Sequence, residues 1–323
     1  MLRRQMSALR ASIPGAPSAA PTHIVTRITL PPHSDEAAWF AKLEGRFRAT
    51  VAAHGSVWVV MELYLRVQQF LAHPQIFFDA MRRKYASYAR ALGEGAWTGG
   101  ASRLAAFQAL LDAGGPAPTL VFARFRAEMD LAEATLRARG YAVWSVRGGM
   151  RRGALGEAVS KSREAVASGA TAVALVVQLQ AGAAGLNLQH CHRVVFLAQH
   201  YNPAIMDQAV ARAHRLGQRH PVTVHHLLLA DGADHNMDRL VLALHSAKRA
   251  AAASISATLA SDCALPDVEE ALQTLLRAEG EGGGEEEEEE EEADDPVDEE
   301  LAAEVAPSSL SQRHPQLHDV PCI

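Results

Sequence analysis

Two arginines late in the chain have a spacing that suits phosphate chemistry. In the stretch QAVARAHRLGQ, Gln208, Arg212 and Arg215 follow one another at offsets of four and three residues. On a continuous helix these offsets place the three side chains on one face, away from Ala209 and Ala213. Guanidinium groups form forked hydrogen bonds with phosphate oxygens and stabilise the charge that develops in phosphoryl transfer. The alternative is a solvated helix face that binds nothing.

A glycine turn precedes the arginines and could bring backbone close to a ligand. GAAGLNL follows the apolar run TAVALVV, and its Gly182 and Gly185 leave room where a β-carbon would clash. Taken alone, such a turn is typical of an ordinary tight connection after a strand. The arginine stretch that follows favours a functional role for this turn.

Alternating strands and helices must position these residues. Amphipathic segments indicate helices, and apolar β-branched runs between them indicate strands. The strands are expected over residues 119–123, 141–146, 171–177, 193–198 and 221–229. Alternation this regular predicts an α/β fold, with a parallel, doubly wound sheet and helices on both of its faces.

The sequence divides into five parts. They are an irregular basic lead-in over 1–34, a helical region over 35–100, the sheet region over 101–250, a helical extension over 251–279 and an acidic tail over 280–323. The lead-in contains one alternating run, HIVTRITL, that could form a strand. The tail contains a run of glutamates and too little apolar content to fold, so we predict that it is disordered.

Composition excludes several classes of protein. The chain has 323 residues, 48% of them hydrophobic, which is ample for a core. No apolar run reaches the roughly 18 residues of a membrane span. The net charge of −6 is concentrated in the glutamate run, so it says little about partners. The three cysteines form no CxxC pair, and adjacent ligands such as His190, Cys191 and His192 rarely converge on one ion, so we predict no metal site.

The two stretches together resemble a specific family. AGAAGLNL and VVFLAQHYNPAIMDQAVARAHRLGQRHPVTVHHLL are similar to motifs V and VI of the second RecA-like lobe of Swi/Snf-type, superfamily-two DNA-dependent ATPases. PTLVFARFRAEMDLAEATLRARGY resembles the motif IV strand and helix, LYLRVQQFLAHPQ the linker helix, and MLRRQMSALRASIP the arginine-rich end of lobe one. The resemblance covers most of residues 1–249 and implies a RecA-like sheet.

The resemblance implies a nucleotide role for the arginine stretch. Arg212 and Arg215 match the motif VI arginines, and Arg215 is the expected finger on the γ-phosphate of ATP. Gln208 would orient that helix. Motif VI is highly specific, so the roles that the resemblance implies for these residues rest on its strongest part.

The resemblance also implies contacts with nucleic acid. Gly182 and Gly185 match the motif V turn, which faces both the nucleotide and the DNA backbone, and Asn187 is expected to order that turn. Where the family has a small hydroxylic residue and a basic one, this chain has Gln178 and Gln180. We expect these two glutamines to weaken a phosphate contact.

ATP and magnesium require residues from another lobe. Such an ATPase holds the phosphates with a loop ending in Gly-Lys-Ser/Thr and the magnesium with an acidic motif. The sequence contains no Gly-Lys pair, and its Asp35-Glu36 pair is expected to begin a helix. ATP and magnesium are therefore expected only with a lobe one supplied in cis or in trans, and the chain alone should hydrolyse ATP negligibly.

These features predict the C-terminal motor lobe of a nuclear, ATP-dependent translocase on double-stranded DNA, or of a chromatin remodeller. The alternative is a non-catalytic module that binds nucleic acid or protein and has kept the fold of such a lobe. The glutamate run, Glu285–Glu292, either solubilises the chain or binds histones or another basic protein.

Overall fold

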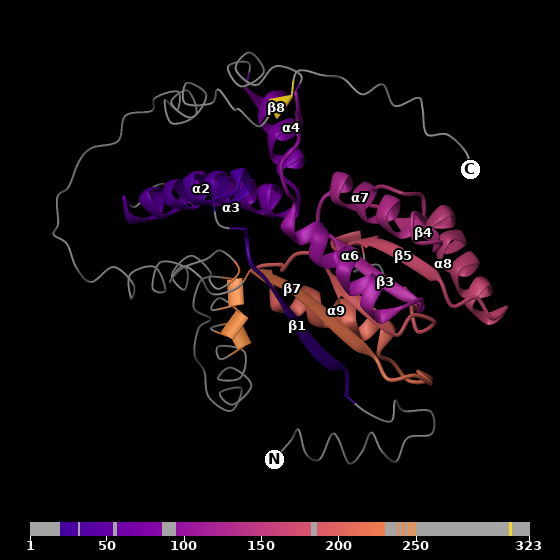
Figure 1. Ribbon diagram of the computed structural model, residues 1–323. Helices are drawn as coiled ribbons and strands as arrows, with labels where there is room; N and C mark the ends of the chain where they lie inside the picture. The colour runs from indigo at the N-terminus through magenta and orange to yellow at the C-terminus, as the bar shows by residue number, and fades with distance from the viewer. Residues whose placement is uncertain are drawn as a thin grey trace, which may run out of the picture. The chain divides into compact units, whose positions relative to one another are not determined.

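The computed structural model describes most of the chain before residue 230 (Figure 1). The described residues are 20–31, 33–53, 57–85, 95–181, 186–229, 238, 241–242, 245–246, 248–249 and 310–311. They fall into two units, a sheet unit within Met1–Thr29 and Ser102–Gln273, and a helical unit within Leu30–Ala101 and Thr274–Ile323. The expected extension over 251–279, and the acidic tail apart from 310–311, lie outside the described residues.

Six parallel strands form the core of the sheet unit (Figure 1). Their order across the sheet is β1-β7-β6-β3-β5-β4, and every neighbouring pair is parallel. The strands are β1 Thr22–Ile28, β3 Thr119–Ala123, β4 Ala142–Val146, β5 Val173–Gln178, β6 Arg193–Phe196 and β7 Thr223–Leu229. The predicted α/β fold with a RecA-like parallel sheet is thereby confirmed.

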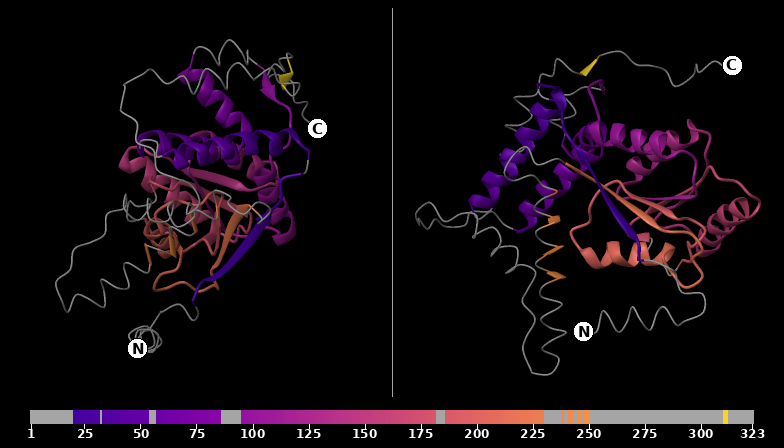
Figure 2. Two further views of the ribbon diagram at one scale, coloured as in Figure 1. Left: turned by 90° about the vertical axis from the view of Figure 1, so that its left-hand side faces the viewer. Right: turned by 60° about the horizontal axis from the view of Figure 1, so that its bottom comes forward.

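Helices cover both faces of this sheet (Figure 2). They are α6 Ser102–Gly114, α7 Arg126–Arg137, α8 Arg152–Ala167 and α9 Pro203–Ala213. Alternate strand residues point to opposite faces. On one face Leu120, Leu175 and Val194 share a core with Val159 of α8 and Met206 of α9. The helices α6 and α7 pack on the other face, so both sides of the strands are buried.

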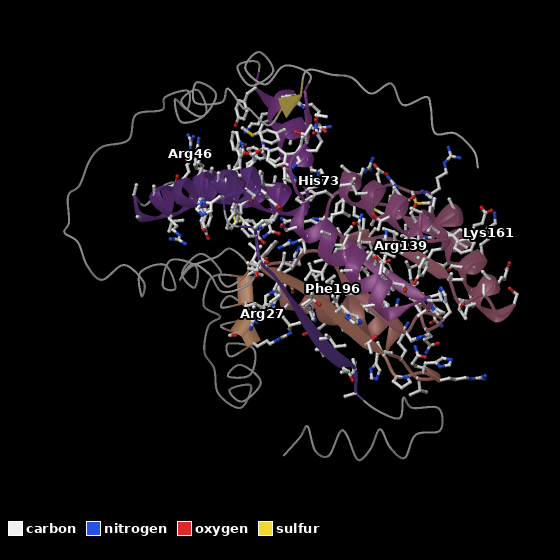
Figure 3. The ribbon with its side chains drawn as sticks, viewed as in Figure 1. Arg27, Arg46, His73, Arg139, Lys161 and Phe196 are labelled. Carbon is white, nitrogen blue, oxygen red and sulfur yellow. The ribbon has the colours of Figure 1, made fainter. Side chains whose placement is uncertain are left out.

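An aromatic stack crosses three neighbouring strands on the α8 and α9 face. The ring of Phe196, labelled in Figure 3, stacks at 5.1 Å between centroids on Phe122 of β3, and at 5.4 Å on His226 of β7. Stacked rings at these separations add to the energy of burial. The stack fixes β6 between its two neighbours.

The run HIVTRITL forms an edge strand of the sheet. β1 pairs with β7 in register from Thr22 opposite Thr223 to Ile28 opposite Leu229. We expected this run within an irregular lead-in, but it is part of the sheet unit, because β7 offers it a free row of backbone partners. Most of β1 is exposed, with Val25 49% exposed, and only its last residue, Ile28, is buried.

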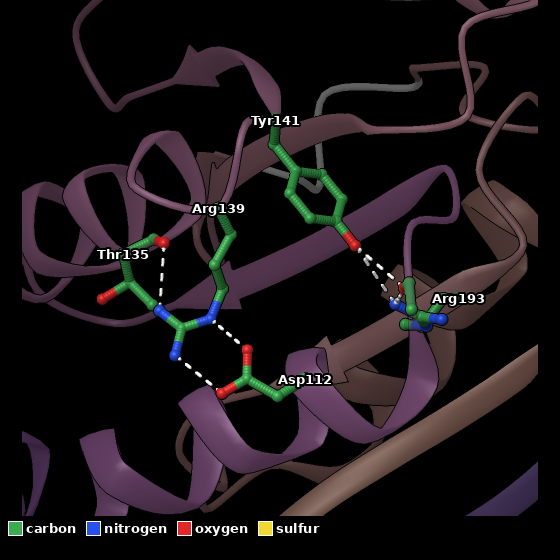
Figure 4. Close-up of polar contacts among 6 residues, drawn as sticks. Asp112, Thr135, Arg139, Tyr141 and Arg193 are labelled. Atoms are coloured by element: carbon green, nitrogen blue, oxygen red, sulfur yellow. Dashed lines mark hydrogen bonds and ion pairs between the residues drawn. The ribbon is translucent and has the colours of Figure 1, made fainter. Parts of the chain in front are cut away.

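Arg193 at the start of β6 holds the carboxyl end of α6 (Figure 4). Its Nη2 donates to the carbonyl of Gly114 at 2.6 Å and its Nη1 to that of Gly115 at 2.9 Å. The hydroxyl of Tyr141 donates to the same Gly115 carbonyl at 3.1 Å. A buried cation suits the negative end of a helix, whose last carbonyls have no partner within the helix.

The described part of the helical unit contains three helices and two short strands. They are α2 Asp35–Ala52, α3 Val57–Ala72, α4 Pro74–Lys84 and β2 Ala96–Trp97, which pairs with β8 Leu310–Ser311. Ser34 begins α2 as predicted, because its Oγ accepts the N–H of Ala37 at 3.1 Å. Aromatic rings of Trp39, Phe78 and Trp97 form its core. None of the described helices is both long and apolar enough to cross a bilayer.

Candidate functional site

The helix that carries Gln208 and Arg212 ends before it reaches Arg215. α9 stops at Ala213, and Arg215 lies in the turn that follows. Gln208 is exposed, four residues before the half-buried Arg212, so these two share a helical face as expected. The expectation that Arg215 continues the same helical face is wrong.

Hydrogen bonds from elsewhere in the chain end this helix. The N–H of Leu188 donates to the carbonyl of Arg212 at 3.0 Å, and the side-chain Nε2 of Gln218 donates to that of Ala213 at 3.0 Å. In a longer helix these carbonyls would accept from N–H groups four residues further on. Partners from two other places replace those groups, so the helix stops.

Residues 214–218 then form a tight turn, which we name the arginine turn. The N–H of Gln218 donates to the carbonyl of Arg215 at 3.1 Å. Gly217 has a φ of 91°, in the left-handed region that favours glycine. Arg215 is exposed, and the neighbouring Leu216 is 56% exposed. The turn therefore holds a guanidinium and an apolar side chain out from a fixed backbone.

Gln218 fixes the arginine turn, a role that the sequence analysis missed. Its side chain is buried, and its Nε2 donates to the carbonyls of Gln189 at 2.9 Å and Ala213 at 3.0 Å, with a longer contact of 3.4 Å to Cys191. Its Oε1 accepts the N–H of His220 at 3.0 Å. The available signal was Gly217, because a glycine soon after a helix marks its end, where the last carbonyls need partners from outside the helix.

The segment between β5 and β6 crosses the sheet from its carboxyl end to its amino end. At one end the N–H of Leu179 donates to the carbonyl of Ala123, the last residue of β3, at 2.9 Å. At the other end the N–H of His192 donates to the carbonyl of Pro118, just before β3, at 3.2 Å. The segment therefore spans the length of β3, roughly 17 Å at about 3.3 Å per residue.

The predicted site residues lie at both ends of this segment. Asn187 is exposed and sits one residue before the backbone contact with α9, close to the arginine turn. Gln180 is exposed at the carboxyl end of the sheet. Gly182 and Gly185 lie outside the described residues. The structure thus brings Asn187 to the arginines and keeps Gln180 apart from them.

Gln178 joins three loops at the carboxyl end of the sheet. Its Oε1 accepts the N–H of Gly148, after β4, at 2.8 Å, and its Nε2 donates to the carbonyl of Arg124, after β3, at 3.4 Å. Arg126 adds a bond of 2.9 Å from its Nη2 to the Gly148 carbonyl. The loops after β3, β4 and β5 are therefore held as one surface.

Arginines surround the helix ends on this surface. Arg126 begins α7, Arg152 begins α8, and Arg151 is the residue that precedes α8; all three are exposed. Arg151 makes no capping bond with its side chain, and the first turn of α8 has no acid. A cation is unfavourable at a helix amino end, where free N–H groups attract anions. This edge is suited to bind an anion.

Two buried groups order the loops after β3 and β6. The Oε2 of Glu128 accepts the N–H groups of Arg124 at 2.6 Å and Phe125 at 3.3 Å, while burial raises the pKa of this carboxyl. Burial, helped by the charge of Arg124, lowers the pKa of His200 to about 4. The neutral imidazole accepts the N–H of Asn202 at 3.0 Å through Nδ1. Both groups therefore shape the loops from within.

The histidine and cysteine before β6 are structural. Burial, with a contribution from Arg163, lowers the pKa of His190 to about 4, and its Nε2 lies 2.9 Å from the hydroxyl of Ser162. Burial raises the pKa of the Cys191 thiol to about 12. In the part of the chain that the structure describes, no three histidine, cysteine or acidic side chains converge on a possible metal position.

Comparison with known proteins gives consistent matches to this region. The family model of the helicase conserved C-terminal domain matches residues 102–217, from α6 to the arginine turn. The chain is 31% identical over 144 residues to the helicase-like transcription factor of Mus musculus, covering 45% of this chain and 14% of that protein. It is 37% identical over 112 residues to the DNA repair protein RAD5 of Cryptococcus neoformans, covering 33% of this chain and 9% of that protein.

A solved structure shares the fold. The crystal structure of the C-terminal part of the Fun30 ATPase domain superposes with a TM-score of 0.52 at 15% identity, covering 80% of this chain and 97% of that one. The chain spans about a seventh of the length of the first curated relatives that it matches.

Proposed function

We propose that the chain carries the C-terminal helicase lobe of a Swi/Snf-type ATPase, and that it supplies half of a motor that hydrolyses ATP and moves on double-stranded DNA. The arginine turn is the observation that carries this proposal. It holds an exposed Arg215 on a backbone fixed by the buried Gln218. An outward-facing guanidinium on a fixed backbone suits the role of an arginine finger.

Each residue of the arginine stretch has a separate part in this proposal. Arg215 reaches across a cleft to the γ-phosphate, where its forked donors stabilise the charge of the transition state. Arg212, half-buried at the end of α9, is the second cation of the site. Gln208 lies one turn earlier on the exposed side of α9, where it would help to orient that helix.

ATP and magnesium would be bound jointly with a first lobe. When bound, magnesium would supply positive charge that neutralises the phosphate oxygens. The described arginines of this chain offer guanidinium donors, which would suit the side of the phosphates that faces away from the first lobe. The sequence contains no Gly-Lys pair for a phosphate loop. We therefore expect negligible ATP turnover by the chain alone.

ATP hydrolysis in a reconstituted mixture tests this proposal. The purified chain, a separately produced Swi/Snf-type first lobe, and both together are assayed for phosphate release with and without duplex DNA. We expect turnover only in the mixture, and we expect DNA to increase it. A mixture that forms a complex but releases no phosphate would favour the alternative, a non-catalytic binding module derived from such a lobe.

The carboxyl end of the sheet is the surface proposed for DNA. The exposed Arg151 and Arg152 lie at the amino end of α8, and the exposed Gln180 lies in the loop after β5. Asn187, the other residue expected to contact nucleic acid, lies at the opposite end of the β5–β6 segment, near the arginine turn. Arginine and backbone N–H contacts with phosphates give affinity without a choice of sequence.

The salt dependence of DNA binding tests this surface. Replacing Arg151 and Arg152 by alanine should reduce the slope of log K against log salt by about one per arginine, because fewer counterions are released. A matched double variant of Arg137 and Lys161, at positions further along α7 and α8, should keep the parent slope. Equal slopes for the two double variants, measured by fluorescence anisotropy, would exclude this surface.

The names of the relatives, a transcription factor and a DNA repair protein, support a nuclear role for this chain. Glu285–Glu292 remains a proposed contact for histones or another basic protein, and it lies outside the described residues. Pull-down of a basic peptide at moderate salt by the full chain, but not by a chain ending at Gly280, is the expected result.

A further inference from the structure

A buried carboxyl lies behind the loop that follows β3. Glu128, in the first turn of α7, is 3% exposed, and its Oε2 accepts the backbone N–H of Arg124 at 2.6 Å and that of Phe125 at 3.3 Å. Its other oxygen, Oε1, is buried and has no hydrogen-bond partner among the residues that the structure describes. One oxygen therefore fixes the loop, and the other is bare.

The charged groups that act on Glu128 come from α6 and from the loop itself. Arg103 of α6 donates from Nη2 to Oδ2 of Asp238 at 2.7 Å, and both side chains are buried, so its charge is already matched. Arg124 is half-buried in the loop. His200, after β6, acts on Arg124, but burial lowers its pKa to about 4, so it is uncharged near neutral pH. An ionised Glu128 would therefore offset mainly the charge of Arg124.

The surroundings of Glu128 favour the uncharged acid. Burial raises the pKa of its carboxyl, while the two backbone N–H bonds and the charges of Arg103 and Arg124 oppose that rise. A carboxylate spreads its charge over both oxygens. Leaving a charged oxygen buried without a donor costs more than leaving a neutral hydroxyl there. The bare Oε1 is therefore the place for a proton.

The loop that Glu128 holds belongs to the surface proposed for DNA. The carbonyl of Arg124 accepts from Nε2 of Gln178 at 3.4 Å, and Nη2 of Arg126 donates to the carbonyl of Gly148 at 2.9 Å. These bonds connect the loop after β3 with those after β4 and β5. A negative charge at Glu128 would lower the positive potential of this surface and weaken its binding of phosphates.

We propose that Glu128 is a positioning residue of the DNA surface and acts as the uncharged acid, so that a proton on Oε1 sets the affinity for phosphates. This inference rests on the proposed function, because it takes DNA to bind at the carboxyl end of the sheet. With the proton bound, Oε2 holds the two backbone N–H groups and the nearby arginines keep their full charge. When the proton leaves, the added negative charge opposes DNA. By reciprocity, DNA binding favours the uptake of a proton at Glu128.

The state of the carboxyl is measured first, in the full chain without DNA. A protonated carboxyl and a carboxylate absorb at separate infrared frequencies. We expect the parent to keep a protonated-carboxyl band well above about pH 4.3, where an ordinary glutamate has lost half of its protons, and Glu128→Gln to lack that band. A parent spectrum with no such band beyond that of Glu128→Gln would overturn the proposal.

Affinity for duplex DNA at low salt is then measured over the same pH range by fluorescence anisotropy. Glu128→Gln keeps an acceptor oxygen for the two N–H groups and cannot ionise, so its affinity should match that of the parent at the acidic end of the range. As the pH rises through the loss of the infrared band, the parent should come to bind DNA about threefold to tenfold more weakly than Glu128→Gln, the effect of one charge near the surface.

Two further variants separate charge from position. Glu133 is also buried on α7, but its carboxylate forms ion pairs with Arg137 at 2.7 Å and with Arg147 at 2.5 Å, so Glu133→Gln is the matched control and should keep the parent's dependence of affinity on pH. Glu128→Leu removes the acceptor. It should bind DNA more weakly than Glu128→Gln and exchange the amide hydrogens of residues 124–126 faster. The comparison of the parent with Glu128→Gln does not depend on this variant.

The outcomes distinguish the inference from the function beneath it. A parent and a Glu128→Gln protein that bind DNA with the same dependence on pH would overturn the inference and leave the proposed function standing. A parent that binds no duplex DNA at any pH in the range contradicts the proposed function, and the inference with it.

Discussion

Arg215 owes its position to residues that are distant from it in sequence. Offsets of four and three are typical of one helical face, but the helix ends at Ala213 because Leu188 and Gln218 take its last carbonyls. The types of the site residues could be predicted from the sequence. The end of the helix could not, because it depends on a partner more than twenty residues earlier in the chain.

Gln218 should matter more for stability than its position after a surface helix suggests. Gln218→Met leaves the buried carbonyls of Gln189 and Ala213 without a donor, and each unsatisfied group costs about 1–3 kcal/mol. We expect urea unfolding to show a loss of about 2–4 kcal/mol. The same change at Gln108 should have little effect. A Gln218→Met protein as stable as the Gln108→Met control would disprove the role of Gln218 in ending the helix.

At the scale of elements, the local sequence pattern predicted which residues form strands. It did not predict which strands pair with each other. The run TLVFA forms β3 over the expected residues 119–123, and α2 begins where Ser34 indicated. The alternating run HIVTRITL could form a strand, but alternation does not say which strand it joins. β1 pairs with β7, almost two hundred residues later, so only the folded chain reveals it.

The contact between β6 and α6 gives a prediction at this scale. Arg193→Met removes the donors to the carbonyls of Gly114 and Gly115, and we expect it to lower the free energy of unfolding by about 2–4 kcal/mol. Arg139→Met, which breaks the more exposed ion pair with Asp112 shown in Figure 4, should have a much smaller effect. Equal losses in thermal or urea unfolding would contradict the importance given to Arg193.

At the scale of the whole molecule, buried histidines make stability depend on pH. Burial lowers the pKa of His190, His200 and His226 to about 4, from 6.5. Between these pH values the three histidines are protonated in the unfolded chain and neutral in the folded chain. The free energy of unfolding is therefore highest above pH 6.5 and decreases as the pH falls toward 4.

Urea midpoints across this range check the pH dependence. We expect the midpoint to fall between pH 6.5 and 4, and the fall to be smaller in a variant with glutamine at the three histidines. A parent midpoint that does not change through this window would show that the three imidazoles are not kept neutral by the fold.

Under the proposed function, the described part of the sheet unit is one side of an active site. Its sheet positions the arginine turn at one end and a surface suited to an anion at the other, joined by the β5–β6 segment. The phosphate loop and magnesium ligands of the proposed reaction belong to a first lobe. The arginines of the proposed site were identified from sequence spacing, whereas the geometry of a complete site would need both lobes.

The rate of ATP hydrolysis tests the proposed arginine finger, Arg215, most directly. In a mixture of this chain, a Swi/Snf-type first lobe and duplex DNA, steady-state ATP hydrolysis is compared between the parent, Arg215→Ala and Arg219→Ala. Arg219 is a nearby exposed arginine, so the two variants lose the same charge. We predict that kcat falls by about 10³-fold or more in Arg215→Ala, the usual effect of losing an arginine finger, and stays near the parent value in Arg219→Ala. An Arg215→Ala mixture that hydrolyses ATP at the parent rate would contradict the account.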